Sequence, residues 1–581
     1  MPDRAFGWVQ DAADYSKLRL TVECFDSSTP TWDTLVSGRV AELADDALIR
    51  DRLLTALQRV PLELRYQELV GSGKNKHNSI LRIALRGQRV DSAMSAWAAD
   101  NFVRWAHALQ LIEYVAANDS LRIAERGRQL LLTARGSAEE GAIWQQALLE
   151  YPPACRILSL LSQSSSLSEP RLSKFQLGHE LGFVGDKGFT SFSEAMYVRE
   201  YALAQSSGDQ VKLRSNFEGD SDKYARQICS WLAGLPTPLV RSHGKEVSVE
   251  VGGEMVPIPV GAYEITSAGS SAMGSVRGTS SHRRTPKFVP VDMLATKSSG
   301  QDRPYLRLRR SVILQEVLRR PRTLADLITV LQSKSITETE AVVQADLQGL
   351  MRMGLQISRV QDRWTCSDSV IGFATPAPAR LPLRSDVQAR IEQLETELIN
   401  VPLEYTALLA IGQDHRLSRQ LEIKTMELLT EVCRWPGILM GGPNRPDGVA
   451  VLDGNAIIID TKDYEEPFAI SADESRKMAQ YVRDARARNP AANATQWWSW
   501  IDTRGIDDAH LRFLYVANAF TGNLTEQLQR LSASVHNTPG AAISTENLLR
   551  FADQLLDNRI SIPVASERLG SLQEIQIDSG N

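Results

Sequence analysis

Two aspartates lie at opposite ends of a short segment, residues 446–462, whose sequence is PDGVAVLDGNAIIIDTK. The pair Asp453-Gly454 separates two apolar runs, and Asp-Gly in this position predicts a two-residue turn between antiparallel strands. With that turn, directly opposed residues share one face of the hairpin. The sequence therefore predicts that Asp447 and Asp460 lie opposite each other on one face.

The alternation of side chains along a strand adds a third charged group to this face. A period of two places Lys462 beside Asp460 and turns Thr461 away. Two opposed carboxylates repel each other unless a cation lies between them, and Mg²⁺ prefers oxygen ligands and also binds phosphate oxygens. A lysine beside the metal can orient or help to deprotonate water and can offset charge on a phosphate. The pattern indicates phosphodiester hydrolysis, with Asp447 and Asp460 as metal ligands and all three residues as catalytic groups.

A structural interpretation of the same residues stays open. A DxK tripeptide alone is common on protein surfaces. In this alternative Asp447 caps a turn, and Lys462 pairs with Asp463 at the end of the strand. The hairpin register and the apolar run before Asp460 favour the catalytic interpretation without deciding between the two.

The elements expected around the hairpin form an α/β domain over residues 386–581 with a mixed central sheet. Ser471 and Glu474 have the spacing of a capping box at the start of one helix. The expected elements are helices at 386–400, 417–433, 472–488, 523–534 and 545–556, a hairpin at 448–460 and strands at 511–518 and near residue 541.

The chain has 581 residues, more than one hydrophobic core usually supports, so several domains are expected. Helical spacing dominates the N-terminal part, a strand pair is expected in VEVGGEMVPIPV, and the Ser- and Gly-rich residues 265–284 are predicted to form a loop or linker. Short helices followed by a strand pair make the third part winged-helix-like, and closely spaced prolines predict a linker after it. The expected divisions are 1–140, 141–284, 285–372, the linker 373–385, and 386–581.

The composition is ordinary for a globular protein, with 43% hydrophobic and 23% charged residues. The formal net charge of −5 gives no general attraction to nucleic acid, so contacts with DNA would need local basic groups. Five separated cysteines without metal-ligand spacing indicate reduced thiols, and the sequence suggests neither a secretory signal nor a membrane span. We therefore expect a cytoplasmic location and no membrane partner.

Two further segments are rich in basic residues. LVGSGKNK, residues 69–76, lacks the first glycine and the final Ser or Thr of a phosphate-binding loop, so an ATPase is not indicated. Its Lys74, Lys76 and the adjacent His77 either touch the DNA backbone or are solvated. The segment 303–322 carries seven arginines and is expected to form a solvated helix face, or else to help hold the nuclease domain.

Motifs along essentially the whole chain resemble the FokI-like family of type IIS restriction endonucleases. In the C-terminal part they are GGPNRPDG, IIIDTKDY, ADESRKMAQYVRD and QWWSW, in the order of the family. Upstream they are FGWVQ, YQELVGSG, NFVRWAHALQLIEY, EYPPACRILSLL, LGFVGDKGFTS, NFEGDSDKYAR, DMLATK and LRRSVILQEVL. The loop between Asp447 and Asp460 is shorter than in the family, but the hairpin register keeps both carboxylates on one face.

The resemblance implies a multidomain fold: mainly α-helical DNA-recognition subdomains of helix-turn-helix or winged-helix type, a linker, and a PD-(D/E)xK nuclease domain. Such an enzyme binds a short asymmetric site in double-stranded DNA and, with Mg²⁺, hydrolyses both strands at a fixed distance to one side. GGATG or a related sequence is the first site to expect. A bacterial cytoplasm, a cognate DNA methyltransferase in the host and a transient homodimer on DNA are also implied. Two alternatives stay open, a strand-specific nicking endonuclease and a non-catalytic DNA-binding regulator.

The resemblance also assigns side chains to DNA contact. NFEGDSDKYAR, residues 216–226, matches a segment that reaches base edges in the major groove, where its side chains can pair with guanine, cytosine and adenine. The alternative for this segment is a surface cluster of ion pairs. Asp11 departs from the family, and the alignment around residue 88 is loose. The expected DNA-binding residues are Gln10, Gln88, Trp97, Asn216, Glu218, Lys223 and Arg226.

The helix at 472–488 pairs two nuclease domains in the family, through an acidic residue and an arginine one turn apart. Here these positions are Arg476 and Gln480, and the arginines at positions 483, 486 and 488 add positive charge. Two such helices repel each other unless an acidic side chain of the partner intervenes, so we expect a monomer in free solution and a weak dimer on DNA. The residues expected at this helix pair are Asp473, Arg476, Gln480 and Asp484.

Overall fold

The computed structural model describes most of the chain in two compact units. The described residues are 4, 6–73, 76–85, 93–183, 186, 194–204, 206–220, 223–251, 254–277, 284–296, 303–376, 385–414, 417–441, 444–464, 466–493 and 495–577. Unit 1 comprises Met1–Ser298, Leu314–Arg322 and Asp346–Pro376, and unit 2 comprises Ser299–Ile313, Thr323–Ala345 and Ala377–Asn581. Lys74, Gln88 and most of the expected linker 373–385 lie outside the described residues.

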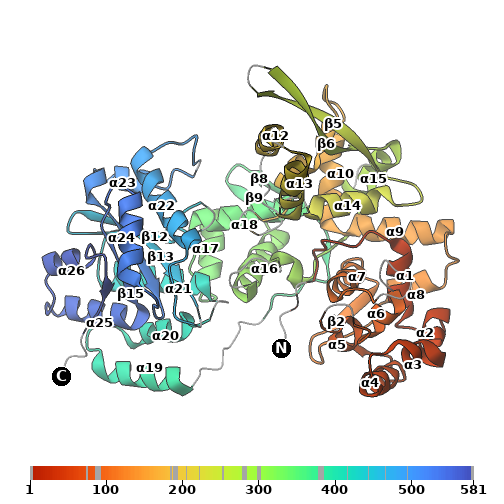
Figure 1. Ribbon diagram of the computed structural model, residues 1–581, viewed down its shortest axis with the longest axis horizontal. Coiled ribbons are helices and arrows are strands. Elements are labelled where there is room, and N and C mark those ends of the chain that lie inside the picture. Colours follow the sequence, from red (N-terminus) through yellow and green to blue (C-terminus); the bar gives the residue numbers. More distant parts are fainter. Residues whose placement is uncertain are drawn as a thin grey trace. The chain divides into compact units, whose positions relative to one another are not determined.

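A six-stranded mixed sheet forms the centre of unit 2, as the sequence predicts (Figure 1). The strand order is β11-β12-β13-β14-β15-β16, with antiparallel pairing from β11 to β13 and parallel pairing from β13 to β16. The strands are β11 (Gly437–Leu439), β12 (Gly448–Leu452), β13 (Asn455–Lys462), β14 (Leu511–Ala517), β15 (Gly540–Ser544) and β16 (Glu574–Ile575).

Helices cover both faces of this sheet, and the alternation along β13 separates two cores (Figure 1). Ile457 and Ile459 face the core that includes α19, α20, α21, α25 and α26, whereas Ala456 and Ile458 face the core that includes α22, α23 and α24. The bounds are α19 (Ser385–Glu397), α20 (Leu408–Ile411), α21 (Ser418–Glu427), α22 (Ala472–Ala487), α23 (Ser499–Asp502), α24 (Leu524–Ser534), α25 (Thr545–Leu556) and α26 (Ile562–Arg568). The helix expected at 417–433 is α-helical only to Glu427. The next five residues, Leu428–Val432, form a π-helix.

The arginine-rich segment forms α16 (Arg303–Arg319), and the expectation of a solvated face is wrong for three of its arginines. Arg307, Arg309 and Arg310 are all less than 9% exposed. Arg309 donates to Glu338, an acid too far along the chain to be matched to it from the sequence. The division between the units runs through α16 and α18 (Glu340–Met353), whereas α17 (Leu324–Gln332) lies wholly in unit 2.

Unit 1 is mainly α-helical. Its helices of nine or more residues outside α16 and α18 are α1 (Tyr15–Glu23), α4 (Ala47–Leu57), α7 (Ala96–Ala108), α9 (Ala138–Glu150), α10 (Pro152–Ser164), α12 (Glu194–Leu203), α13 (Ser207–Asp220), α14 (Lys223–Ala233) and α15 (Ser267–Arg277). Its small sheets have the strand orders β1-β3-β2, β4-β6-β5, β7-β10 and β8-β9. The strands are β1 (Leu64–Arg65), β2 (Ile112–Val115), β3 (Ser120–Ile123), β4 (Leu172–Ser173), β5 (Val240–Val251), β6 (Glu254–Ile265), β7 (Lys287–Phe288), β8 (Ile357–Val360), β9 (Arg363–Cys366) and β10 (Val370–Ile371). No helix of the described residues has the length and apolar character that a membrane crossing requires.

The loop predicted at 265–284 is wrong, because α15 occupies its first half. The Thr266 hydroxyl accepts a hydrogen bond from the backbone N–H of Gly269 and so caps the helix. A Cβ on Gly269 would lie 2.2 Å from the backbone oxygen of Leu239, so glycine allows the close approach, and Met273 and Val276 are buried. Tertiary packing of small residues outweighs their low helix propensity here.

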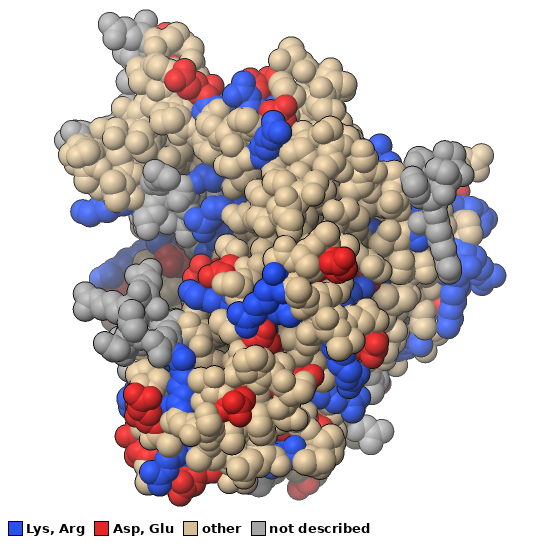
Figure 2. Space-filling view, turned by 90° about the vertical axis from the view of Figure 1, so that its right-hand side faces the viewer, with Lys and Arg blue, Asp and Glu red and all other residues tan. Residues whose placement is uncertain are grey.

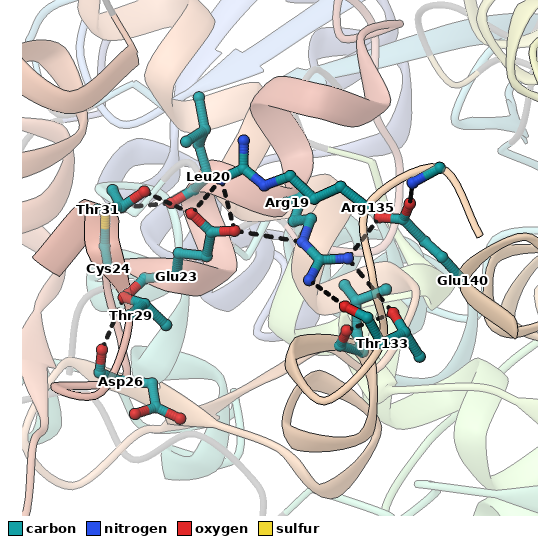
Figure 3. Close-up of polar contacts among 12 residues, drawn as sticks. Arg19, Leu20, Glu23, Cys24, Asp26, Thr29, Thr31, Thr133, Arg135 and Glu140 are labelled. Atoms are coloured by element: carbon teal, nitrogen blue, oxygen red, sulfur yellow. Dashed lines mark hydrogen bonds and ion pairs between the residues drawn. The ribbon is translucent and has the colours of Figure 1, made fainter.

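A buried ion-pair network joins α1 to the start of α9 (Figure 3). Arg19 contacts Glu23 at 3.2 Å and Glu140 at 2.8 Å, and it donates to the backbone oxygen of Thr133 at 2.7 Å. Arg135 contacts the same Glu23 carboxylate at 2.6 Å. Each buried charge therefore has a partner, which buried ions need if they are not to destabilise the fold.

Candidate active site

The hairpin has the predicted register. Asp453 and Gly454 form the turn, with φ angles of 51° and 73°. The paired residues run from Leu452 with Asn455 to Gly448 with Ile459. One residue beyond β12, the backbone N–H of Asp447 donates to the carbonyl oxygen of Ile459 at 3.1 Å, so the ladder continues to the position opposite Asp460.

Alternation along β13 brings Asp460 and Lys462 to the face covered by α22. The Lys462 ammonium lies 2.8 Å from Asp460 Oδ2 and 2.5 Å from Glu474 Oε2. Lys477, one turn further along α22, contacts Asp460 Oδ1 at 3.3 Å. The side chain of Asp460 is fully buried and that of Lys462 is 7% exposed, whereas 43% of the Lys477 side chain is exposed.

The alternative pairing of Lys462 with Asp463 is not formed. Asp463 instead accepts a hydrogen bond from the Ser418 hydroxyl at 2.7 Å. Glu474 and Lys477 were not predicted to join this cluster, although their spacing of three residues puts them on one face of α22. Glu474 was expected to complete a capping box with Ser471, but its carboxylate contacts Lys462, and only the Ser471 hydroxyl caps the helix by accepting from the Glu474 N–H.

Asp447 binds Thr461, which the alternation rule had turned away. The Thr461 N–H and hydroxyl donate to Asp447 Oδ2 at 2.6 and 2.9 Å. The reason is that β12 begins at Gly448, so the Thr461 N–H lies past the end of the paired ladder and takes a side-chain acceptor. Within the described residues, Asp447 Oδ1 accepts no hydrogen bond.

The electrostatics of the two aspartates differ. Burial raises the pKa of Asp447 to about 7, helped by the nearby charges of Glu422 and Asp460. Burial also opposes the charge on Asp460, but Lys462 and Lys477 outweigh it and lower the pKa of Asp460. Burial likewise disfavours the charge on Lys462, but Asp460 above all raises its pKa, so this lysine is an ammonium at neutral pH. In this state Lys462 stabilises negative charge and is not a base.

The donor atoms at this face fit a magnesium ion. Asp460 Oδ2, though close to the Lys462 ammonium, is buried without a well-directed hydrogen bond, and the Asp447 carboxylate lies near enough for the charges of the two aspartates to interact. Among the described residues, no group of three or more His, Cys, Asp or Glu side chains is placed to hold a metal. Two carboxylates suffice for Mg²⁺, which keeps several waters and uses substrate phosphate oxygens as further ligands.

A second group of ion pairs in unit 2 includes Glu422, whose charge acts on Asp447. Arg419 contacts both Glu422 and Glu338, and Glu338 also binds Arg309. Burial opposes the charge on Glu338, but Arg309 and Arg419 outweigh it and lower its pKa to about 2. Gly441 leaves room for this group, because a Cβ there would lie 2.0 Å from an Arg419 nitrogen. These ion pairs hold α21 and the segment before β12 in place relative to Arg309 and Glu338.

The residues expected to contact DNA lie in unit 1, where basic and acidic side chains are interspersed on the face drawn in Figure 2. Gln10 is 9% exposed, and its amide donates to the Tyr224 hydroxyl at 3.0 Å. Trp97 is 43% exposed on α7, and Lys223 and Arg226 are partly exposed in the first turn of α14. The remaining positions are Asn216 and Glu218 in α13, whose side chains, like all of Gln88, lie outside the described residues.

The helix expected to pair nuclease domains is α22. Not all of the residues expected at this helix pair are exposed. Asp473 and Arg476 form an exposed ion pair with each other, and Gln480 is exposed. Asp484 is 6% exposed and accepts hydrogen bonds from Gln480 and Asn493, so it is not placed to meet a partner helix.

The positive charge expected at the end of α22 is also smaller. Arg488 forms ion pairs with Asp502 and Asp508, and Arg486 donates to the Thr538 hydroxyl. Arg483 remains exposed, two turns from Arg476 on the same face of the helix. Arg476 and Arg483 are therefore the exposed arginines of this face, and the charge of Arg476 is partly offset by Asp473.

Comparison with known proteins covers the whole chain. Family models match for the FokI recognition domain, subdomain 1 (residues 4–133) and subdomain 2 (140–281), the FokI D3 domain (294–362) and the FokI cleavage domain (384–576). The chain is 31% identical to the type II restriction enzyme FokI of Planomicrobium okeanokoites, over 94% of each chain. It is 30% identical to the type II restriction enzyme StsI of Streptococcus sanguinis, over 96% of this chain and 93% of the relative.

Solved structures give the same result. The fold matches the structure of restriction endonuclease FokI with a TM-score of 0.62, and the structure of FokI bound to DNA with a TM-score of 0.61. Both are 29% identical and cover 99% of this chain and all of theirs. The order of recognition and cleavage domains, the mixed sheet and the sequence identity over the full length agree, and the chain therefore belongs to the FokI-like family of type IIS restriction endonucleases.

Proposed function

We propose that this endonuclease uses Mg²⁺, held by Asp447 and Asp460, to hydrolyse phosphodiester bonds of both DNA strands at a fixed distance from a short asymmetric site. The observation that carries the proposal is the convergence of Asp447, Asp460 and Lys462 on one face of a buried hairpin. Mg²⁺ bound there would supply Lewis-acid activation of water and charge neutralisation at the phosphate.

The protein's own groups have separate parts in this proposal. Asp460 is held as a carboxylate by the two lysines. Asp447 is oriented by the N–H and hydroxyl of Thr461, which leaves Oδ1 for the metal. The Lys462 ammonium, fixed by Glu474, offsets the negative charge that develops on the phosphate during hydrolysis.

Recognition of the DNA is assigned to unit 1, with Lys223, Arg226, Asn216 and Glu218 as the first candidates for base contact. GGATG or a related sequence is the first site to test, since it is the site expected from the resemblance. A host that carries such a nuclease must protect its own copies of the site, which supports a cognate DNA methyltransferase as a partner in the cell.

Cutting both strands calls for two active sites related by a two-fold axis, because the strands are antiparallel and each cluster faces one phosphate at a time. We propose a transient homodimer on DNA through the outer face of α22. A strand-specific nicking enzyme is the second candidate, and the observation that favours it is the positive charge of Arg476 and Arg483 on that face.

Digestion of a plasmid of known sequence, with the ends mapped on both strands, tests this function. We expect Mg²⁺-dependent breaks at one distance from one asymmetric sequence, and protection when that sequence is methylated. Breaks in one strand only would support the nicking enzyme. Cleavage that persists in excess chelator would contradict the metal site.

A further inference from the structure

Lys477 joins the cluster for a reason that neither the alternation of β13 nor the hairpin register explains. It comes from α22, and its ammonium lies 3.3 Å from Asp460 Oδ1, on the opposite oxygen from Lys462. Two ammonium groups therefore bracket one fully buried carboxylate. A single lysine would already neutralise the charge of that carboxylate, so the presence of a second lysine requires a separate explanation.

The two lysines are held differently. Lys462 is buried and also contacts Glu474 at 2.5 Å. Lys477 is 43% exposed, its contact with Asp460 is longer, and Asp460 is its one ion-pair partner among the described residues. The Lys477 ammonium also lies 5.7 Å from the centroid of the Tyr481 ring. Of the two cations, Lys477 is the one that can leave Asp460 without leaving an acid unpaired.

A divalent cation and the two ammonium groups compete for the same aspartate. Like charges within a few ångströms oppose each other strongly where water is excluded, so a metal at Asp460 favours the departure of the less tightly held lysine. The side chain of Lys477 reaches solvent, and a released lysine at the rim of a nuclease site is suited to a phosphate oxygen of the bound strand.

We propose that Lys477 is a further residue of the nuclease site, which holds Asp460 before the metal binds and, once displaced by the metal, binds a phosphate oxygen of the DNA strand to be cut. This inference rests on the proposed Mg²⁺ site at Asp447 and Asp460. It assigns α22 two roles on adjacent faces, with Lys477 and Glu474 toward the cluster and Arg476 and Arg483 outward.

The test is a calorimetric titration of the full-length protein with MgCl₂ in the absence of DNA. We expect Lys477→Met and Lys477→Gln to bind Mg²⁺ about three- to tenfold more tightly than the wild type, because one competing cation is removed. With DNA and saturating Mg²⁺, the same variants should cut more slowly by about tenfold, and Lys477→Arg should recover much of the rate.

Lys424→Met is the matched control. Lys424 also lies on a helix of unit 2, is partly exposed, pairs with one carboxylate, Glu427, at 2.7 Å, and has its ammonium 5.3 Å from an aromatic ring, that of Tyr405. It should leave both the Mg²⁺ affinity and the cleavage rate unchanged. A residue that only supports the fold would not tighten metal binding when removed, so the titration separates the proposed role from a structural one.

The outcomes are distinguishable. If the wild type binds Mg²⁺ and the two variants bind it equally or more weakly, the role of Lys477 is refuted while the metal site stands. If the wild type binds no Mg²⁺, or binds it equally well after Asp460→Asn, the proposed metal site itself fails and the inference falls with it.

Discussion

The catalytic cluster and the expected DNA contacts are assembled in different ways. Asp447, Asp460 and Lys462 lie within sixteen residues of sequence. Asp447 directly precedes β12, Asp460 and Lys462 lie on the paired strand β13, and the register and alternation of this hairpin put them on one face. Gln10 and Lys223 come from segments far apart in the chain, and Gln10 is tied to Tyr224 of α14. A local rule therefore brings the proposed catalytic residues together, whereas the proposed recognition residues depend on long-range packing in unit 1.

The largest expected effect concerns the proposed catalytic residues of the hairpin. Asp460→Asn should reduce cleavage by about a thousandfold or more, because the metal ligand and the partner of two ammonium groups are lost together. DNA binding, measured by mobility shift, should persist because the proposed recognition residues lie in unit 1. Asp463→Asn, at the same strand end but bonded to Ser418, is the control and should keep near wild-type cleavage. Near wild-type cutting by Asp460→Asn would remove this residue from the site.

The second prediction asks whether the cluster depends on support from outside the hairpin. Glu338→Gln should destabilise the protein at neutral pH by about 3–5 kcal/mol, since Arg309 and Arg419 would keep buried charges without their shared acid. Chemical unfolding followed by tryptophan fluorescence measures this. The exposed Glu340→Gln should change stability by less than about 0.5 kcal/mol.

The stability difference between the wild type and Glu338→Gln should depend on pH. The pKa of Glu338 is lowered to about 2 in the folded protein, below its ordinary value of 4.5. Its contribution to stability is therefore fully present above about pH 4.5 and is lost as the pH falls toward 2. The gap between wild type and Glu338→Gln should narrow over this range. A gap that is constant from pH 7 to pH 3 would show that the charge of Glu338 is not what stabilises the unit.

Much of unit 2 could be predicted from its sequence, because its elements are long and strongly patterned. The hairpin register followed from Asp453-Gly454, and the expected helices and strands appear within a few residues of their predicted bounds. Glu474 and Lys477 could not be assigned to the cluster, since their position depends on how α22 packs on β13 and β14. The burial of Asp484 and Arg309 has the same cause: each is satisfied by a residue from another element that no local pattern identifies.

The third prediction tests the recognition side. Lys223→Ala and Glu218→Ala should each cost about 1–3 kcal/mol of binding free energy at particular base pairs, as expected for contacts with base edges. Competition binding against sites with single-base substitutions measures the change. An even loss on every site would instead assign these side chains to the phosphate backbone.

The smallest expected effect concerns the outer face of α22. In a two-fold arrangement each contact between unlike residues occurs twice, so Arg476 of one molecule near Arg483 of the other would repel at two places. Arg483→Glu should turn both repulsions into attractions. At about 0.2–1 kcal/mol for each of the two exposed pairs, double-strand cutting per enzyme should rise about two- to thirtyfold at low protein concentration.

Wild-type cutting per enzyme should itself increase with protein concentration, because in the proposed dimer the second nuclease domain comes from another molecule. The control is Arg530→Glu on α24, an exposed arginine outside this face, which should not change the concentration dependence. Asp484 is unsuitable for such a test, because it is buried and its replacement would disturb α22 itself. If the rate per enzyme stays flat over a hundredfold dilution while both strands are still cut, pairing through α22 is excluded, and one nuclease domain must turn over between the two strands.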